Sequence, residues 1–130
     1  MKRTIDTSDA PAAVSAYSQG VVANNFLFTA GQVALRPDGG LANGSIEEET
    51  RQVMANLQAI LEAAGCSFAD VVQARVYITD RAFFAAVNTV YAEYFTAGEE
   101  PVRECVIAAP PIKGTHVEIS MVAEMPSQNA

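Results

Sequence analysis

Apolar residues recur every three or four positions between residues 46 and 64, which is the spacing of a helix with one buried face. The apolar positions are Val53, Leu57, Ile60, Leu61 and Ala64. Ser45 precedes Glu48 by three residues, the spacing of a capping box, and Gly65 is suited to end the helix. The pattern therefore predicts one long amphipathic helix over 46–64.

A second helix is predicted to run from just after Asp80 to about residue 95. Asp80 is suited to cap its N-terminus, and Thr96-Ala97-Gly98 follows its end. The side chains expected to face inward are Phe84, Val87, Tyr91 and Tyr94. This helix is shorter than the first, and its apolar face is richer in aromatic residues.

Strands are predicted over 26–33, 71–79, 103–109 and 115–125, from β-forming residues bounded by turn signals. In the second stretch, Val72, Ala74, Val76 and Ile78 share one face. In the last, Val117, Ile119, Met121 and Ala123 alternate with His116, Glu118, Ser120 and Val122. The order of strands, helix, strand, helix and strands predicts an α+β fold, with two helices packed on one face of a mixed sheet.

The other face of this sheet is expected to carry Arg75, Tyr77, Glu118 and Ser120. This set is too polar for a core and too apolar for a free surface, so a partner subunit is expected to cover it.

Composition predicts a single domain over residues 1–130, because a chain of this length with half its residues apolar buries a real core. It has no apolar run of 18 residues and no apolar stretch behind its first charges, so neither a membrane span nor a secretory signal is expected. Cys66 and Cys105 form no disulfide framework and are interpreted as reduced thiols of a cytoplasmic protein. The net charge of −7, without a basic patch, argues against a nucleic-acid partner.

Two charged residues interrupt apolar strands and are the main candidates for chemistry. Arg103 opens the stretch Arg103-Glu104-Cys105-Val106, and Glu118 lies between Val117 and Ile119. A charge in such a segment costs free energy unless it is paired, solvated or lining a cavity. The two are expected on neighbouring strands, where a guanidinium binds a carboxylate and a carboxylate orients a water. An interface salt bridge is the alternative interpretation of both residues.

Cys105 shares strand parity with Arg103, so both side chains are expected on the same face. A nucleophilic cysteine usually has a basic partner, and the only histidine, His116, forms no recognisable triad with it. Cys105 is therefore interpreted as a small filler that contributes its backbone N–H. His116 is expected at a surface or an interface, and no metal-ligand spacing is present.

Five short motifs occur in a fixed order. They are Ala16-Tyr17-Ser18-Gln19-Gly20, Thr29-Ala30-Gly31-Gln32, the stretch from Thr50-Arg51-Gln52 through Asn56-Leu57 to Ala63-Ala64-Gly65, Val87-Asn88, and the pair Arg103 and Glu118. With these motifs the chain resembles the RidA/YjgF family of enamine/imine deaminases from about Thr4 to Met125. The resemblance implies a chorismate-mutase-like fold and a homotrimer with sites between subunits.

The resemblance also implies roles for individual residues. Arg103 would hold the substrate carboxylate, and Glu118 would position the attacking water. Tyr17 and Gly31 would line the pocket, and Cys105 would offer its backbone N–H. Asn88 would lie near the pocket or an interface, with a surface-helix position as the alternative.

The leading functional hypothesis is hydrolysis of small 2-imino acids, or their 2-aminoacrylate-type enamine tautomers, to 2-oxo acids and ammonia without a cofactor. Ala30, where many members have serine, and Glu104, where a small residue is usual, depart from the family pattern. The connection Glu99-Glu100-Pro101 is also shorter than is common in the family. The departures around Glu100 and Glu104 keep open a specialised catabolic deaminase of aminoacrylate or aminomuconate type. A binding or chaperone-like trimer is the non-enzymatic alternative, and the acidic charge argues against RNA cleavage.

Overall fold

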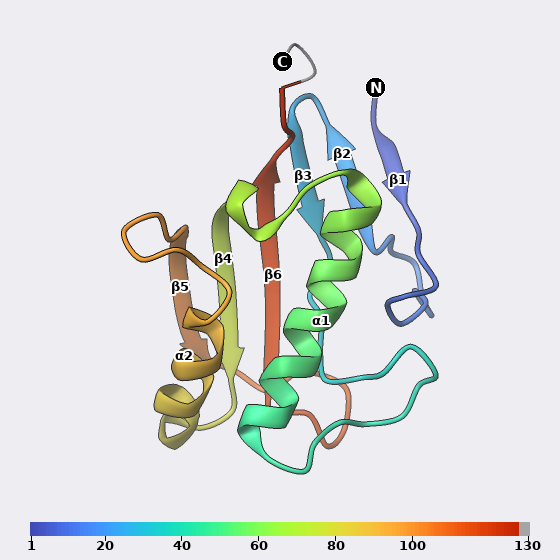
Figure 1. Cartoon of the computed structure of the whole chain (residues 1–130). Helices are drawn as coiled ribbons and strands as arrows, with labels where there is room; N and C mark the ends of the chain where they lie inside the picture. Colours follow the sequence, from blue (N-terminus) through green and yellow to red (C-terminus); the bar gives the residue numbers. More distant parts are fainter. Residues whose placement is uncertain (128–130) are drawn as a thin grey trace.

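Six strands form one mixed sheet in the computed structural model, which describes residues 1–127. In chain order the elements are β1 (Arg3–Ile5), β2 (Gly20–Ala23), β3 (Phe26–Thr29), α1 (Ile46–Ala64), β4 (Val71–Ile78), α2 (Phe84–Ala92), β5 (Val102–Ile107) and β6 (Val117–Glu124). The strands lie in the order β1-β2-β3-β6-β4-β5, and only β4 and β5 pair in parallel. Both helices cover the same face of the sheet (Figure 1), which confirms the predicted α+β fold.

The first helix begins and ends where the sequence predicts. The Ser45 hydroxyl accepts a hydrogen bond from the Glu48 backbone N–H at 3.0 Å, and Gly65 ends the helix with a φ of 89°. The reciprocal bond of a capping box does not form, because the Glu48 carboxylate instead accepts from the Arg36 guanidinium at 3.3 Å.

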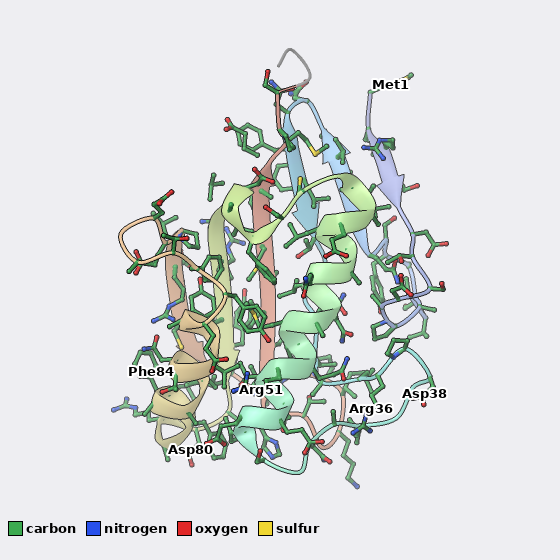
Figure 2. All side chains as sticks on the ribbon, viewed as in Figure 1. Met1, Arg36, Asp38, Arg51, Asp80 and Phe84 are labelled. Carbon is green, nitrogen blue, oxygen red and sulfur yellow. The ribbon has the colours of Figure 1, made fainter. Side chains whose placement is uncertain are left out.

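An ion pair joins the two helices on their outer side. The Arg51 guanidinium of α1 donates to both carboxylate oxygens of Glu93, which follows α2, at 2.8 and 3.0 Å. Figure 2 shows Arg51 between the two helices. Both side chains are about half exposed, so the pair adds at most about 1 kcal/mol.

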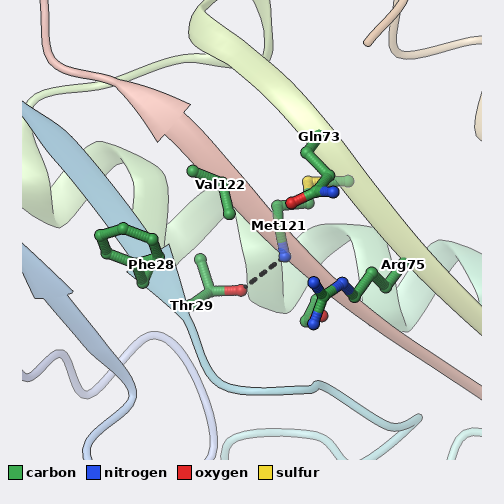
Figure 3. A pocket seen from close by; sticks show the side chains of 7 residues that line it. Phe28, Thr29, Gln73, Arg75, Met121 and Val122 are labelled. Atoms are coloured by element: carbon green, nitrogen blue, oxygen red, sulfur yellow. Dashed lines mark hydrogen bonds between the residues drawn. The ribbon is translucent and has the colours of Figure 1, made fainter. Parts of the chain in front are cut away.

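The sheet face opposite the helices carries the mixed set of side chains that the alternation predicts. A hollow of about 290 Å³ lies on this face. Figure 3 shows Phe28, Gln73 and Arg75 among the side chains that line it. The Thr29 hydroxyl closes one side by accepting a hydrogen bond from the Met121 backbone N–H at 2.9 Å.

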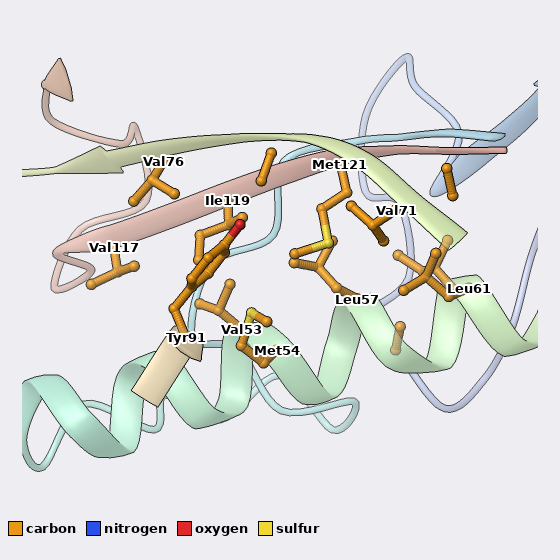
Figure 4. Close-up of a cluster of buried hydrophobic side chains, with 14 of the residues drawn as sticks. Val53, Met54, Leu57, Leu61, Val71, Val76, Tyr91, Val117, Ile119 and Met121 are labelled. Atoms are coloured by element: carbon orange, nitrogen blue, oxygen red, sulfur yellow. The ribbon is translucent and has the colours of Figure 1, made fainter. Parts of the chain in front are cut away.

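The core lies between α1 and the helix-facing side of the sheet (Figure 4). All five apolar positions predicted for α1 are buried, and so are the alternating residues Val117, Ile119, Met121 and Ala123 of β6. Each valine, leucine, isoleucine or methionine side chain among them contributes about 1.5–3 kcal/mol on burial. This packing fixes which residues of β6 face the helices, and it therefore places Glu118 on the other side.

Several element boundaries differ from the prediction. The first two strands were not predicted, and β3 ends at Thr29 instead of continuing to residue 33. Beyond Thr29, the Ala30 backbone N–H still donates to the Gln19 carbonyl at 2.9 Å, and Gln32 forms two backbone hydrogen bonds with Ile119 at 2.8 and 3.1 Å. Asp80 caps a short 3-10 turn, Arg81–Phe83, and the α-helix starts only at Phe84.

The placement of Val72 on one face with Ala74, Val76 and Ile78 is wrong, and so is the inward-facing assignment of Phe84. A β-bulge between Val71 and Gln73 shifts the alternation at the start of β4, so Val71 is buried while Val72 is 42% exposed. Phe84 is 44% exposed, because it lies at the first turn of α2 and reaches toward Arg103 rather than the core.

Candidate active site

Arg103 lies on the helix-facing side of β5, at the edge of the sheet. Its Cα partner on β4 is the buried residue Ala74, and its guanidinium donates to the Asn88 side-chain oxygen at 2.9 Å. The guanidinium carbon lies 4.9 Å from the centre of the Tyr91 ring and 5.7 Å from that of Phe84. All three contacts come from α2, so this helix determines where the charge lies.

The Arg103 guanidinium has N–H groups left for a ligand. Arginine carries five N–H donors, and within the described residues only Asn88 accepts one of them. No carboxylate of residues 1–127 lies within 4.0 Å of it, although Glu100 lines the same cavity of about 500 Å³. A partly buried guanidinium that has N–H donors to spare and no ion-pair partner is suited to bind a carboxylate through two parallel hydrogen bonds.

Cys105 pairs with Val76 of β4 and therefore faces the same side as Arg103, as the strand parity predicts. Burial raises the pKa of its thiol, while the charge of Arg103 opposes that rise. A thiol with a raised pKa is a poor nucleophile at neutral pH.

His116 provides no base for Cys105, since its ring Nδ1 lies 2.5 Å from the fully buried Glu49 carboxylate. Its backbone N–H also donates to Glu49 at 2.9 Å. The His116 side chain is 41% exposed, so it lies at the surface as expected, and it is also the partner of the buried Glu49 carboxylate.

Glu118 lies on the opposite side of the sheet, in register with Tyr77 of β4. Gly31 approaches it closely: a Cβ atom at Gly31 would lie 2.5 Å from the carboxylate oxygen Oε2. The absence of a side chain at position 31 thus makes room for the carboxylate.

The Glu118 carboxylate is partly buried, and no hydrogen bond or ion pair within residues 1–127 involves it. Burial raises its pKa above the usual range of a glutamate. A carboxylate in this environment is suited to orient a water or to exchange a proton with it.

A cavity of about 550 Å³ opens beside Glu118. Its polar and glycine walls include Tyr17, Gly31 and Glu118, and its apolar walls include Val14, Leu35 and Ile112. Tyr17 lies in a loop and is 49% exposed. The predicted site residues Tyr17, Gly31 and Glu118 thus come together in one cavity.

The six predicted site residues therefore form two groups within one chain: Asn88, Arg103 and Cys105 on the helix side, and Tyr17, Gly31 and Glu118 on the other. The expectation that Arg103 and Glu118 lie on neighbouring strands is wrong, because β4 lies between β5 and β6. They also face opposite sides, since Arg103 pairs with Ala74 and Glu118 with Tyr77, and alternate residues of β4 point in opposite directions.

Sequence reasoning missed two aromatic neighbours of Arg103 and one wall of the Glu118 cavity. Phe84, Asn88 and Tyr91 are spaced by four and three residues, which places them on one stripe of a helix, and this spacing was the available signal. Pro111 and Ile112, in the loop before β6, line the cavity beside Glu118. The sequence of this loop has no periodicity from which its position beside the cavity could be predicted.

Within residues 1–127, no group of three histidine, cysteine, aspartate or glutamate side chains is arranged to hold a metal ion. No helix in this part of the chain is long and apolar enough to cross a bilayer.

The family model described as endoribonuclease L-PSP matches residues 7–125. A RutC family protein of Synechocystis is 43% identical over 127 residues, covering 96% of this chain and 98% of its own. The 2-iminobutanoate/2-iminopropanoate deaminase of Rattus norvegicus is 40% identical over 124 residues, covering 95% of this chain and 90% of its own. The crystal structure of RidA from an Antarctic Psychrobacter superposes with a TM-score of 0.88 at 38% identity, covering 95% of this chain and 99% of its own.

Proposed function

Since the chain belongs to the endoribonuclease L-PSP family, which is the RidA/YjgF family that its motifs resemble, we propose that it hydrolyses small 2-imino acids and their enamine tautomers. The products would be 2-oxo acids and ammonia. The observation that carries the proposal is the unpaired, partly buried Glu118 carboxylate in a cavity with Tyr17 and Gly31.

Arg103 would hold the substrate carboxylate. Its guanidinium is fixed by one hydrogen bond to Asn88 and keeps further N–H donors for a planar, bidentate partner. Such fixation turns the attack of water into an effectively intramolecular step, so positioning supplies much of the acceleration.

Glu118 would orient the attacking water toward the C2 carbon of the imine. The water oxygen forms a bond to C2, and the electron pair of the C=N bond moves to nitrogen. Glu118 accepts one proton from the water and passes it to nitrogen, which gives a carbinolamine. It then accepts the remaining hydroxyl proton and passes it to nitrogen as the C=O bond forms, the C–N bond breaks and ammonia leaves. The carbonyl oxygen of the 2-oxo acid then comes from water, and the reaction needs no oxidant.

The site would be completed between two copies of the chain in a homotrimer. Arg103 and Glu118 of one chain face opposite sides of the sheet, so one substrate meets both only if they come from different subunits. The mixed sheet face with Phe28 and Arg75, and the exposed apolar side chains of β5, offer surfaces for such contacts.

We do not propose RNA cleavage, although the family description includes that activity. Binding of RNA depends on clustered lysines and arginines, and this chain has 8 of them against 15 acidic residues. The acidic balance favours a small-molecule substrate over a polyanion.

The test is release of ammonia and 2-oxo acid from imines generated in situ by an amino acid oxidase. Arg103→Lys keeps the charge but loses the planar fork, so kcat/KM should fall roughly tens- to several-hundredfold. Glu118→Gln should lower the rate while leaving binding of the 2-oxo acid product largely intact. A wild-type protein that does not accelerate imine loss would exclude the proposed function.

A further inference from the structure

We propose that Phe84 and Tyr91 are positioning residues for Arg103. Their ring faces hold the guanidinium while leaving its N–H edge free for a carboxylate ligand. This inference rests on the proposed function of Arg103, and it assigns a role to two aromatic residues that do not themselves touch the reacting atoms.

Both rings lie within the range in which a cation is attracted to an aromatic face. The Arg103 guanidinium carbon is 4.9 Å from the Tyr91 ring centre and 5.7 Å from the Phe84 ring centre, inside the limit of about 6 Å. Asn88 lies between them on the same stripe of α2 and takes one N–H at 2.9 Å. Among the described residues, one helix face therefore supplies the hydrogen bond and both ring contacts of the guanidinium.

An aromatic partner leaves the charge and the N–H donors of Arg103 available to a ligand, whereas an acidic partner would not. A carboxylate bound to Arg103 within the chain would neutralise its charge and occupy the N–H pairs that a substrate needs. A ring face attracts the guanidinium plane and uses no N–H donor. Within residues 1–127 the Arg103 guanidinium contacts rings and forms no ion pair with a carboxylate, which is the arrangement expected of an anion-binding arginine.

Tyr91 is itself held in place. It is 5% exposed, and its ring centre lies 4.8 Å from that of Phe95, which contacts Phe68 at 5.7 Å. The Tyr91 hydroxyl is buried and has no hydrogen-bond partner within residues 1–127, and burial raises the pKa of this phenol to about 12. The residue therefore acts on Arg103 through its ring, not through its hydroxyl.

Three variants separate the ring contact from general stability. Phe84→Leu removes a half-exposed ring and should lower kcat/KM about three- to tenfold, mostly through KM. Tyr91→Phe keeps the ring and should stay within about twofold of wild type. Tyr94→Leu is the matched control: its ring contacts Phe68 at 5.1 Å, and no contact with Arg103 is formed.

The deciding measurement is a double-mutant cycle of Phe84→Leu and Arg103→Ala. It is followed by kcat/KM and by calorimetric binding of 2-oxobutanoate. In chains that keep Arg103, the ¹⁵N order parameter of its Nε–H reports how firmly the guanidinium is held. Phe84→Leu should lower the order parameter and should have no further effect on rate or binding once Arg103→Ala is present. Equal effects of Phe84→Leu with and without Arg103 would overturn the positioning role, and so would an unchanged order parameter.

The readouts distinguish this failure from failure of the proposed function. If the protein binds 2-oxobutanoate through Arg103 but hydrolyses no imine, the proposed hydrolysis is excluded. The positioning role of the rings is then still tested by the affinity for 2-oxobutanoate and by the Arg103 order parameter. A wild-type protein that neither binds 2-oxobutanoate nor hydrolyses imines would overturn both, because Arg103 would then hold no carboxylate.

Discussion

Arg103 and Glu118 of one chain lie on opposite faces of the sheet, with β4 between their strands. If each active site takes Arg103 from one subunit and Glu118 from the next, two inactive variants should complement each other. In trimers that contain both Arg103→Ala and Glu118→Gln chains, one of the three sites has both wild-type residues, so about a third of wild-type activity should return.

The mixed trimers are made by coexpression with two different tags, and the rate is measured on the doubly purified fraction. Each variant purified alone is the control for residual activity. No recovery in a mixed oligomer would place both residues in the same site of one chain and would contradict the intersubunit arrangement.

Gly31 should be intolerant of any side chain. A Cβ atom in Gly31→Ala would lie 2.5 Å from the Glu118 carboxylate, so that carboxylate must move. Displacement of a water-orienting group costs on the order of 2–3 kcal/mol, or about tens- to a hundredfold in kcat. Gly40→Ala, in the same loop and without contact to Glu118, is the control and should keep its rate. Equal rates for both variants would show that Glu118 has room to relocate.

Cys105→Ser should keep most of the rate, within about threefold of wild type. Burial raises the pKa of the thiol, so little thiolate is present at neutral pH. The substitution preserves the backbone N–H and nearly the same volume. A loss as large as that of Arg103→Lys would instead identify the thiol as a participant in the reaction.

The regular part of the fold follows from the sequence because burial and periodicity determine it together. The apolar stripe of α1 and the alternation in β6 each have one arrangement that buries the residues expected to face inward, and the structure has that arrangement. This alternation also places Glu118 on the polar face. For site residues on the same strand, such as Arg103 and Cys105, the local sequence was therefore sufficient to predict that they share a face.

The relation between the two halves of the site could not be read in this way. Whether β5 lies beside β6 or beside β4 depends on tertiary pairing, and no local pattern in either strand encodes it. The bulge at the start of β4 and the partnership of His116 with Glu49 have the same origin, since each depends on packing between segments far apart in the sequence.

His116→Ala should destabilise the protein by about 1–3 kcal/mol, because it leaves the buried Glu49 carboxylate with only the backbone N–H at position 116. Urea unfolding at fixed protein concentration measures the free energy of unfolding. His116→Ala combined with Glu49→Gln should recover part of the loss, since the buried charge is then absent. An unaltered midpoint for His116→Ala would show that the ring contact contributes nothing to stability.

Glu118 should make the protein less stable as pH rises through the acid range. Its pKa is raised by burial in the folded chain, whereas the unfolded chain has an ordinary glutamate pKa near ~4.3. At a pH below both pKa values, Glu118 is protonated in the folded and the unfolded chain and does not affect stability. At a pH above both, the folded state carries the cost of a poorly solvated charge.

Glu118→Gln should therefore unfold at a higher temperature than wild type at neutral pH, and the difference should vanish as the pH falls below the pKa of Glu118 in the unfolded chain. Thermal unfolding across this range measures it, with Glu99→Gln, an exposed carboxylate, as the control for net charge. A Glu118→Gln variant less stable than wild type at neutral pH would mean that the carboxylate has a favourable partner in the assembled protein, and that it is not the free group that orients water.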